Sequence, residues 1–195
     1  MADAPTFLLL GQTGAGKSSF VNATFGKELA ETDDFQACTK LVAHYHEATG
    51  YGRICLIDTP GLAENTDALD QKYLAMVRDA LAARRNVVTL YISPLNATRL
   101  GQPERATLHA ISRELGAAIW CNVWLVLTFG ALVKPHKLYV TAEARQRLIR
   151  EYIAGIPEAR FPGFQRVICV DSIATEQWIG GAVPIAAALA RGVHQ

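Results

Sequence analysis

The sequence predicts an α/β fold, a three-layer sandwich whose six-stranded, mostly parallel sheet has one antiparallel edge strand. Short apolar runs alternate with segments of helical spacing along the chain, which is the pattern of a parallel sheet covered on both faces. Two of the runs, Leu41–Glu47 and Arg53–Ile57, are joined through Gly50 and Gly52, which predicts an antiparallel hairpin. Half of the 195 residues are apolar, so we expect residues 1–195 to form a single domain with a substantial core.

The other elements follow from apolar runs and from helix start and stop signals. The remaining predicted strands are short apolar or β-branched runs, as expected of buried strands: Phe7–Leu10, Val87–Ile92, Cys121–Leu127 and Val167–Val170. The predicted helices have helical spacing and often begin at proline or end near glycine: Ser18–Phe25, Asp67–Arg85, Pro103–Leu115, Ala142–Ile153 and Pro184–Gly192. In such a sheet, the loops at the carboxyl ends of the strands are expected to carry the functional site.

Charge and composition exclude several classes of partner. The 19 basic and 18 acidic residues give a net charge of +1, which predicts no nucleic-acid partner. No apolar stretch approaches the length of a membrane span and no signal pattern opens the chain, so membrane association is not encoded in this segment. The four cysteines form no C-x-x-C pair, which suggests neither a zinc site nor a disulfide scaffold, and a reducing compartment is expected: Cys38, Cys55, Cys121 and Cys169.

A glycine-rich loop between the first strand and the first helix predicts a phosphate site. Gly11–Ser18 matches G-x-x-x-x-G-K-S, and its backbone N–H groups can point at phosphate oxygens. Lys17 is expected to bridge the outer phosphates, and the Ser18 hydroxyl is expected to bind Mg²⁺. A chance glycine-rich turn is the alternative, but the strand-to-helix context favours the motif. The expected phosphate-binding residues are Gln12, Thr13, Gly14, Ala15, Gly16, Lys17, Ser18 and Ser19.

A second acidic element follows the Arg53–Ile57 strand. Asp58 begins a D-T-P-G segment and is expected to hold Mg²⁺ through water, while Gly61 can offer its N–H to a γ-phosphate. A nucleotide switch also needs a hydroxyl from the polar segment between the two elements. Thr39 is the expected metal ligand there, and Thr32 is the alternative.

Together these motifs resemble the signature elements of the translation-factor-like GTPases, and within them the septin-related branch. That branch includes the septins, the immunity-associated GTPases and the Toc GTPases of the chloroplast outer envelope. Further segments are similar to the Toc pattern, namely Asn96–Leu100, Leu115–Trp120 and Leu127–Ala131. The resemblance implies a Ras-like P-loop GTPase fold, a single G domain, GTP or GDP as the bound nucleotide, and Mg²⁺.

The base-reading segments depart from the usual GTPase pattern. The aspartate that reads guanine is absent from the segment at Thr128 and Phe129, as it is in Toc-type proteins. Phe129 either stacks on the base or closes the loop as a core residue. The resemblance places Asp171 and Ser172 in the last base-contacting loop, where Asp171 could partly replace the missing carboxylate.

Hydrolysis is expected to be slow, because Leu62 stands where Ras-like enzymes have a water-orienting glutamine. Arg99 matches the arginine that Toc-type proteins insert toward a partner's nucleotide, which implies a homodimer through the nucleotide face. A solvated loop residue is the alternative. Lys17, Thr39, Gly61 and Arg99 are thus the expected catalytic residues.

The sequence therefore predicts a slow, dimer-linked GTPase that acts as a switch, read by a protein partner through its switch loops. The expected location is the cytoplasm or the cytosolic face of an organelle membrane, the plastid envelope if the chain is Toc-like. A small-molecule P-loop kinase and a non-hydrolysing nucleotide-binding interaction module are the alternatives. His44 and His46 share a face of one strand with no evident carboxylate or cysteine partner, and they are interpreted as surface residues. Trp120 and Trp124 are interpreted as core aromatics. A solvated helix face is expected to hold three arginines: Arg145, Arg147 and Arg150.

Overall fold

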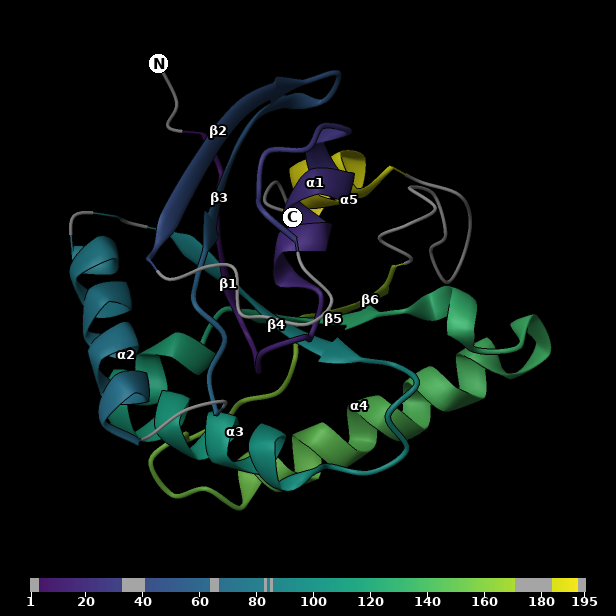
Figure 1. The fold of residues 1–195 in the computed structure, drawn as a ribbon. Helices are drawn as coiled ribbons and strands as arrows, with labels where there is room; N and C mark the ends of the chain where they lie inside the picture. The colour runs from purple at the N-terminus through teal and green to yellow at the C-terminus, as the bar shows by residue number, and fades with distance from the viewer. Residues whose placement is uncertain are drawn as a thin grey trace.

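The computed structural model describes residues 4–32, 41–63, 67–82, 84, 86–170 and 184–192. It contains one six-stranded sheet of order β2-β3-β1-β4-β5-β6 (Figure 1). The β2–β3 pair is antiparallel and the other four pairs are parallel, which confirms the predicted fold class. The strands are β1 (Thr6–Leu10), β2 (Ala43–Thr49), β3 (Gly52–Asp58), β4 (Val87–Pro94), β5 (Val123–Thr128) and β6 (Arg166–Cys169).

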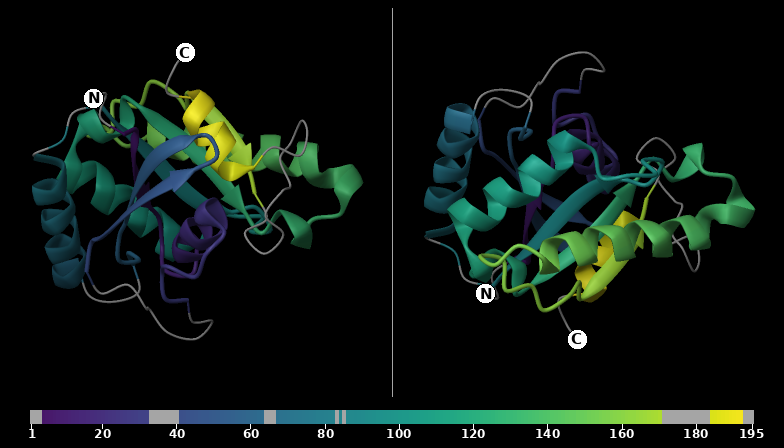
Figure 2. Two further views of the ribbon diagram at one scale, coloured as in Figure 1. Left: turned by 90° about the horizontal axis from the view of Figure 1, so that it is seen from above. Right: turned by 90° about the horizontal axis from the view of Figure 1, so that it is seen from below.

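Helices cover both faces of the sheet. Helices α1 and α5 lie on one face, and α2, α3 and α4 lie on the other (Figure 2). In the part of the chain that the structure describes, every helix is too short or too polar to cross a bilayer. The helices are α1 (Lys17–Phe25), α2 (Asp67–Ala82), α3 (Gln102–Leu115), α4 (Leu138–Ala154) and α5 (Ile185–Gly192), with short 3₁₀ helices η1 (Ala117–Trp120), η2 (Gly130–Leu132) and η3 (Pro135–Lys137).

Alternation along the central strands divides the core into two parts. All five residues of β1 are buried, as a strand covered on both faces requires. Leu8 and Leu10 pack toward α2, α3 and α4, whereas Phe7 and Leu9 pack toward α1 and α5. The sheet is therefore held from both sides, and the carboxyl ends of its parallel strands meet at one edge.

The two tryptophans are core residues, as the sequence predicts, and they lie in opposite parts of the core. Trp120 is fully buried on the α2–α3–α4 side, and its indole N–H donates to Ser112 Oγ at 3.1 Å. Trp124 packs on the other side and makes an edge contact with Phe7. Each large ring fills core volume, and neither is available for a ligand.

Some predicted boundaries and one burial assignment were wrong. Cys121 is exposed and precedes β5, which begins at Val123, because the chain first makes the turn of η1. Helix α4 begins at Leu138, four residues before its predicted start. Tyr139 and Val140 are exposed on that first turn, so apolar residues on the outer face obscure the helical period.

Candidate nucleotide-binding site

The phosphate loop lies between the end of β1 and the start of α1, against the carboxyl end of β4. Gly14 and Gly16 adopt φ angles of 72° and 90°, in the left-handed region that favours glycine. At Gly11 an added Cβ would lie 2.5 Å from the carbonyl oxygen of Ile92. Any other residue at this position would push the loop away from β4, so the glycines of the motif are needed for the loop's shape.

Lys17 is buried beneath the loop and held there by the loop's own backbone. Its Nζ donates to the carbonyl oxygens of Gly11 at 3.1 Å and Gln12 at 3.0 Å. The Thr128 hydroxyl, from the end of β5, donates to the carbonyl oxygen of Ala15 at 2.7 Å. The Lys17 ammonium and the N–H groups of the loop together create positive potential at this position. Such an arrangement is suited to binding phosphate.

A hydroxyl and a carboxylate meet at the start of α1. Ser18 Oγ donates to Asp58 Oδ2 at 2.9 Å, and Asp58 Oδ1 accepts from the Thr59 N–H at 3.0 Å. Asp58 is fully buried at the end of β3, and Thr59 is fixed by its hydroxyl, which donates to the carbonyl oxygen of Leu9 at 2.6 Å. Oxygen donors of this kind are those that Mg²⁺ prefers, so the residues present fit the metal that the motif implies.

The D-T-P-G segment packs directly on the phosphate loop. A Cβ at Gly61 would overlap Thr13, and the Thr13 hydroxyl is buried with no hydrogen-bond partner among the described residues. Leu62 forms a parallel bridge with Gln12, and its carbonyl oxygen accepts from the Thr13 N–H at 3.2 Å. The Leu62 side chain is 2% exposed and belongs to the core. It therefore cannot orient a water molecule.

Phe129 has an unusual conformation at the end of β5. Its φ and ψ are 59° and 36°, a left-handed geometry that an aromatic residue adopts at a cost. The ring is partly exposed and belongs to neither core cluster of the described residues, which favours a base contact over core packing. The adjacent Gly130 N–H donates to the carbonyl oxygen of Val170 at 3.1 Å, which ties the loop after β5 to the end of β6.

Arg99 lies on the loop between β4 and α3 with its side chain exposed. Its carbonyl oxygen accepts from Arg145 Nη1 at 3.0 Å. Arg145 also pairs with Glu104 and donates to Ser93 Oγ, at 3.0 Å from Nη2. The predicted solvated face of α4 was therefore wrong for Arg145, whose side chain is 2% exposed. The helical pattern of the sequence did not reveal that Glu104 on α3 is a buried partner of Arg145.

Three predicted site residues lie outside the described residues: Thr39, Asp171 and Ser172. Thr32, the alternative to Thr39, is exposed, and Ser19 is half-buried in the first turn of α1. The other predicted site residues surround the phosphate loop or lie on the loops that follow β3, β4 and β5.

His44 and His46 are exposed, as the sequence predicts, but a cysteine that the sequence pattern did not reveal lies close to them. His46 Nε2 lies 3.6 Å from Cys55 Sγ, across the β2–β3 hairpin. Arg84 also reaches this group, 3.4 Å from His44 Nδ1. Burial first, then the charge of Arg84 and neighbouring His46, lowers the pKa of His44. Sequence spacing could not show this group, because the cross-strand register brings it together.

Comparison with known proteins gives a consistent result. The model of the AIG1 family matches residues 5–153. Translocase of chloroplast 33 from Arabidopsis thaliana is 33% identical over 133 residues, which are 68% of this chain and 44% of that protein. A structure of Toc33 from Arabidopsis thaliana in complex with GDP and Mg²⁺ has a TM-score of 0.72 at 23% identity, and covers 97% of this chain and 81% of that chain.

A structure of the chloroplast translocon components atToc33 and psToc159, for whose GTPase activity dimerization is important, has a TM-score of 0.79 at 24% identity. It covers 96% of this chain and 83% of that chain, and it shares the fold described above. The chain spans less than half the length of the curated relatives it matches. The family model covers most of the chain, from β1 to the end of α4, and the protein belongs to the AIG1 family.

Proposed function

We propose that this chain is a single G domain that binds GTP with Mg²⁺, hydrolyses it slowly and acts as a nucleotide-dependent switch. The observation that carries the proposal is the meeting of three groups at one loop. Lys17 is fixed under the phosphate loop, and Ser18 and Asp58 lie 2.9 Å apart beside it. The related Toc33 structure with GDP and Mg²⁺ supports the choice of nucleotide and metal.

Each group has a distinct role in this proposal. The loop N–H groups and Lys17 bind the phosphates and neutralise charge that develops during transfer to water. Ser18 and Asp58 hold Mg²⁺, with Thr39 as the third metal-binding residue. When held by these residues, Mg²⁺ would supply positive charge that neutralises the phosphates. Gly61 offers its N–H to the γ-phosphate, and its contact with Thr13 makes the following segment sensitive to hydrolysis.

The base is bound between the loops after β5 and β6. Thr128 fixes the first loop to the phosphate loop, and the strained Phe129 lies against the base. Asp171 and Ser172 supply polar contacts from the second loop. The hydrogen bond from Gly130 to Val170 sets the spacing of the two loops, and this supports a shared role.

In this proposal hydrolysis is slow because of Leu62, and two copies of the chain pair so that Arg99 can act on the partner's nucleotide. Because the Leu62 side chain is in the core, the chain has no water-orienting group at that position. A pair formed through the nucleotide face can bring an arginine to the partner's phosphates, where such a residue raises rates by about 10³ to 10⁵. Arg99 suits this role because its backbone is fixed by Arg145 while its side chain is exposed.

The relatives' names also guide a proposal for location. Several are chloroplast translocase components. We place the switch at the cytosolic face of an organelle membrane, the plastid envelope in a plant cell. A protein partner reads the switch loops there.

Nucleotide binding tests the first part of the proposal. Calorimetry with Mg²⁺ is expected to show tighter binding of GTP than of ATP. Lys17→Ala is expected to abolish tight triphosphate binding while circular dichroism shows a folded protein. Lys137→Ala, which changes a lysine on the exposed η3 turn, is the matched control and should bind normally. Equal affinity for GTP and ATP would refute guanine selectivity, and unchanged binding by Lys17→Ala would refute the site.

Hydrolysis at several protein concentrations tests the pairing. The rate per molecule is expected to rise with concentration and to lose that dependence in Arg99→Ala. Arg147→Ala, an exposed arginine on α4, is the matched control. A rate independent of concentration and unaffected by Arg99→Ala would refute the arginine's role. Tight binding without hydrolysis at any concentration would favour a non-hydrolysing module.

A further inference from the structure

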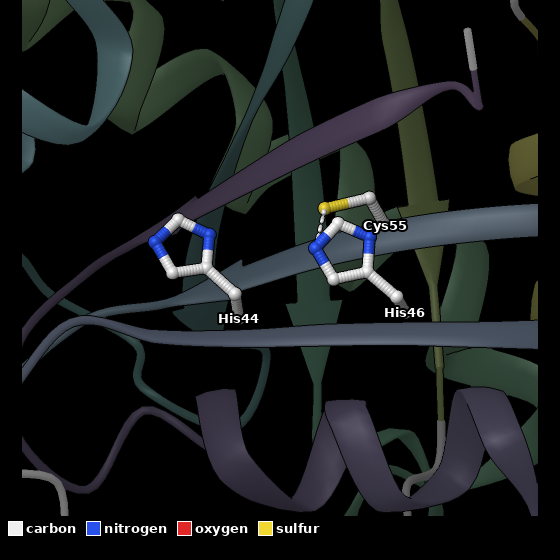
Figure 3. Close-up of side chains that lie close together, drawn as sticks. All are labelled: His44, His46 and Cys55. Carbon is white, nitrogen blue, oxygen red and sulfur yellow. Dashed lines mark hydrogen bonds between the residues drawn. The ribbon is translucent and has the colours of Figure 1, made fainter. Parts of the chain in front are cut away.

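We propose that His44, His46 and Cys55 bind one Zn²⁺ ion at the sheet edge, at a site separate from the nucleotide site. His44 and His46 are two residues apart on β2, so their side chains point to the same face. Figure 3 shows both rings on that face, with Cys55 on the neighbouring strand directed at His46. The register explains the meeting, because His46 is paired with Cys55 in the β2–β3 hairpin.

The distances suit a tetrahedral zinc ion. With Zn–S of about 2.3 Å and Zn–N of about 2.0–2.1 Å, a tetrahedral S···N edge is about 3.6 Å long. His46 Nε2 and Cys55 Sγ are 3.6 Å apart. One ligand atom from each of His44, His46 and Cys55 lies within 4.8 Å of the others. Since an N···N edge is about 3.4 Å, the widest gap, of at most 4.8 Å, must close by at most about 1.4 Å.

The donor set favours Zn²⁺ over Mg²⁺. One thiolate and two imidazoles suit Zn²⁺, whereas Mg²⁺ prefers oxygen donors. Three protein ligands leave a fourth position for water or an external ligand. His44 and His46 are exposed while Cys55 is 1% exposed, so an ion can enter from solvent and reach a thiol fixed in the core.

The site is independent of the phosphate loop. Cys55 precedes Asp58 by three residues on β3, which separates them by about 10 Å along the strand. An odd spacing also places their side chains on opposite faces of the sheet. A single ion therefore cannot contact both residues, and Mg²⁺ at Ser18 and Asp58 leaves the histidines unoccupied.

The Arg84 guanidinium would compete with the metal ion for this site. Its Nη1 lies 3.5 Å from Cys55 Sγ and its Nη2 lies 3.4 Å from His44 Nδ1, so the guanidinium contacts two of the proposed donors. A positive charge at this distance disfavours a cation. Arg84 also lines a cavity of about 490 Å³ together with Arg78 and Asn122, which gives its side chain room to move away when the ion binds.

Cobalt(II) titration of the full chain, with excess Mg²⁺ to occupy the phosphate-loop site, tests the proposal. We expect a thiolate-to-cobalt charge-transfer band and intense tetrahedral d–d bands, both removed by one equivalent of Zn²⁺. His44→Ala, at an exposed position, and Cys55→Ser are expected to lose the charge-transfer band or weaken binding by about tenfold or more. His109→Ala and Cys169→Ser are the matched controls, and they should keep both the charge-transfer band and the metal affinity of the unaltered chain.

The Arg84→Ala variant distinguishes a metal site from a chance cluster of side chains. If the guanidinium competes with the ion, its removal tightens Zn²⁺ binding by about tenfold. Nucleotide binding of His44→Ala should equal that of the unaltered chain, so failure here does not depend on the nucleotide proposal. A cobalt spectrum without a thiolate band, a spectrum unchanged by Cys55→Ser, or weaker Zn²⁺ binding by Arg84→Ala would each overturn the inference.

Discussion

Replacing Arg145 by methionine is expected to destabilise the fold strongly. The Arg145 and Glu104 side chains are 2% and 3% exposed, and both contact Ser93. Arg145→Met keeps much of the side-chain volume but leaves the Glu104 carboxylate buried without its cation. Removing one partner of a buried ion pair costs about 3–5 kcal/mol. Because solvent does not reach this pair, the expected cost of about 3–5 kcal/mol is not reduced by solvent screening.

This magnitude can be checked by a double-mutant cycle. For a chain of this size, a loss of 3–5 kcal/mol lowers the melting temperature by about 6–20 °C. Glu104→Gln should also destabilise, since it leaves the Arg145 guanidinium without a charged partner. The double variant Arg145→Met/Glu104→Gln contains neither buried charge, so its free energy of unfolding should exceed the additive expectation by about 2 kcal/mol.

Urea unfolding followed by circular dichroism gives the four free energies of the cycle, and comparing them requires that the four m-values be equal. Arg147→Met, at an exposed position on the same helix, is the control and should change stability by less than about 0.5 kcal/mol. If Arg145→Met cost less than about 1 kcal/mol, or if the two single changes were additive, the guanidinium would not be compensating a buried carboxylate.

Further predictions concern the phosphate loop and the cysteines. Gly61→Ala should weaken GTP binding measured by calorimetry, because the added methyl group overlaps Thr13; normal affinity would contradict the contact. Leu62→Gln should lower the free energy of unfolding by about 1–3 kcal/mol without speeding hydrolysis, because the amide enters the core; faster turnover would refute this. Burial raises the pKa of Cys169 to about 12, so about one in a thousand of its thiols is ionised at pH 9. Peptide mapping after alkylation should therefore find exposed Cys121 modified first, and equal rates would argue against burial of Cys169. The raised pKa also predicts a contribution to stability that is present below pH 9 and is lost as the pH rises toward 12.

The sheet and the phosphate loop could be predicted because their signals are local. Apolar runs that stop at glycine, such as the one before Gly11, identify buried strands, and the loop motif fixes the positions of Lys17 and Ser18. The antiparallel hairpin could also be predicted, from the two glycines that join its strands, whereas the order of the strands came from the structure. Features that one motif contains are thus accessible from the sequence.

Contacts between distant side chains could not be predicted in the same way. Arg145 and Glu104 are 41 residues apart, and helical periodicity treats both as polar residues on outer faces. The proximity of His46 and Cys55 depends on hairpin register, and a slip of one residue would move every side chain of β2 to the other face. The structure was needed because these partnerships depend on tertiary packing.

The bridge between Gln12 and Leu62 has a mechanical consequence for α2. The residue after Leu62, Ala63, donates its N–H to the Asp70 carboxylate in the first turns of α2, at 2.9 Å from Oδ2. The phosphate loop is thus linked to α2 through the Gln12–Leu62 bridge, the peptide bond to Ala63 and the hydrogen bond to Asp70. Helix α2 has 16 residues and is about 24 Å long. A tilt of about 10° imposed at the amino end of this helix would move its far end by about 4 Å. Small rearrangements of the phosphate loop would in this way be amplified at the carboxyl end of α2.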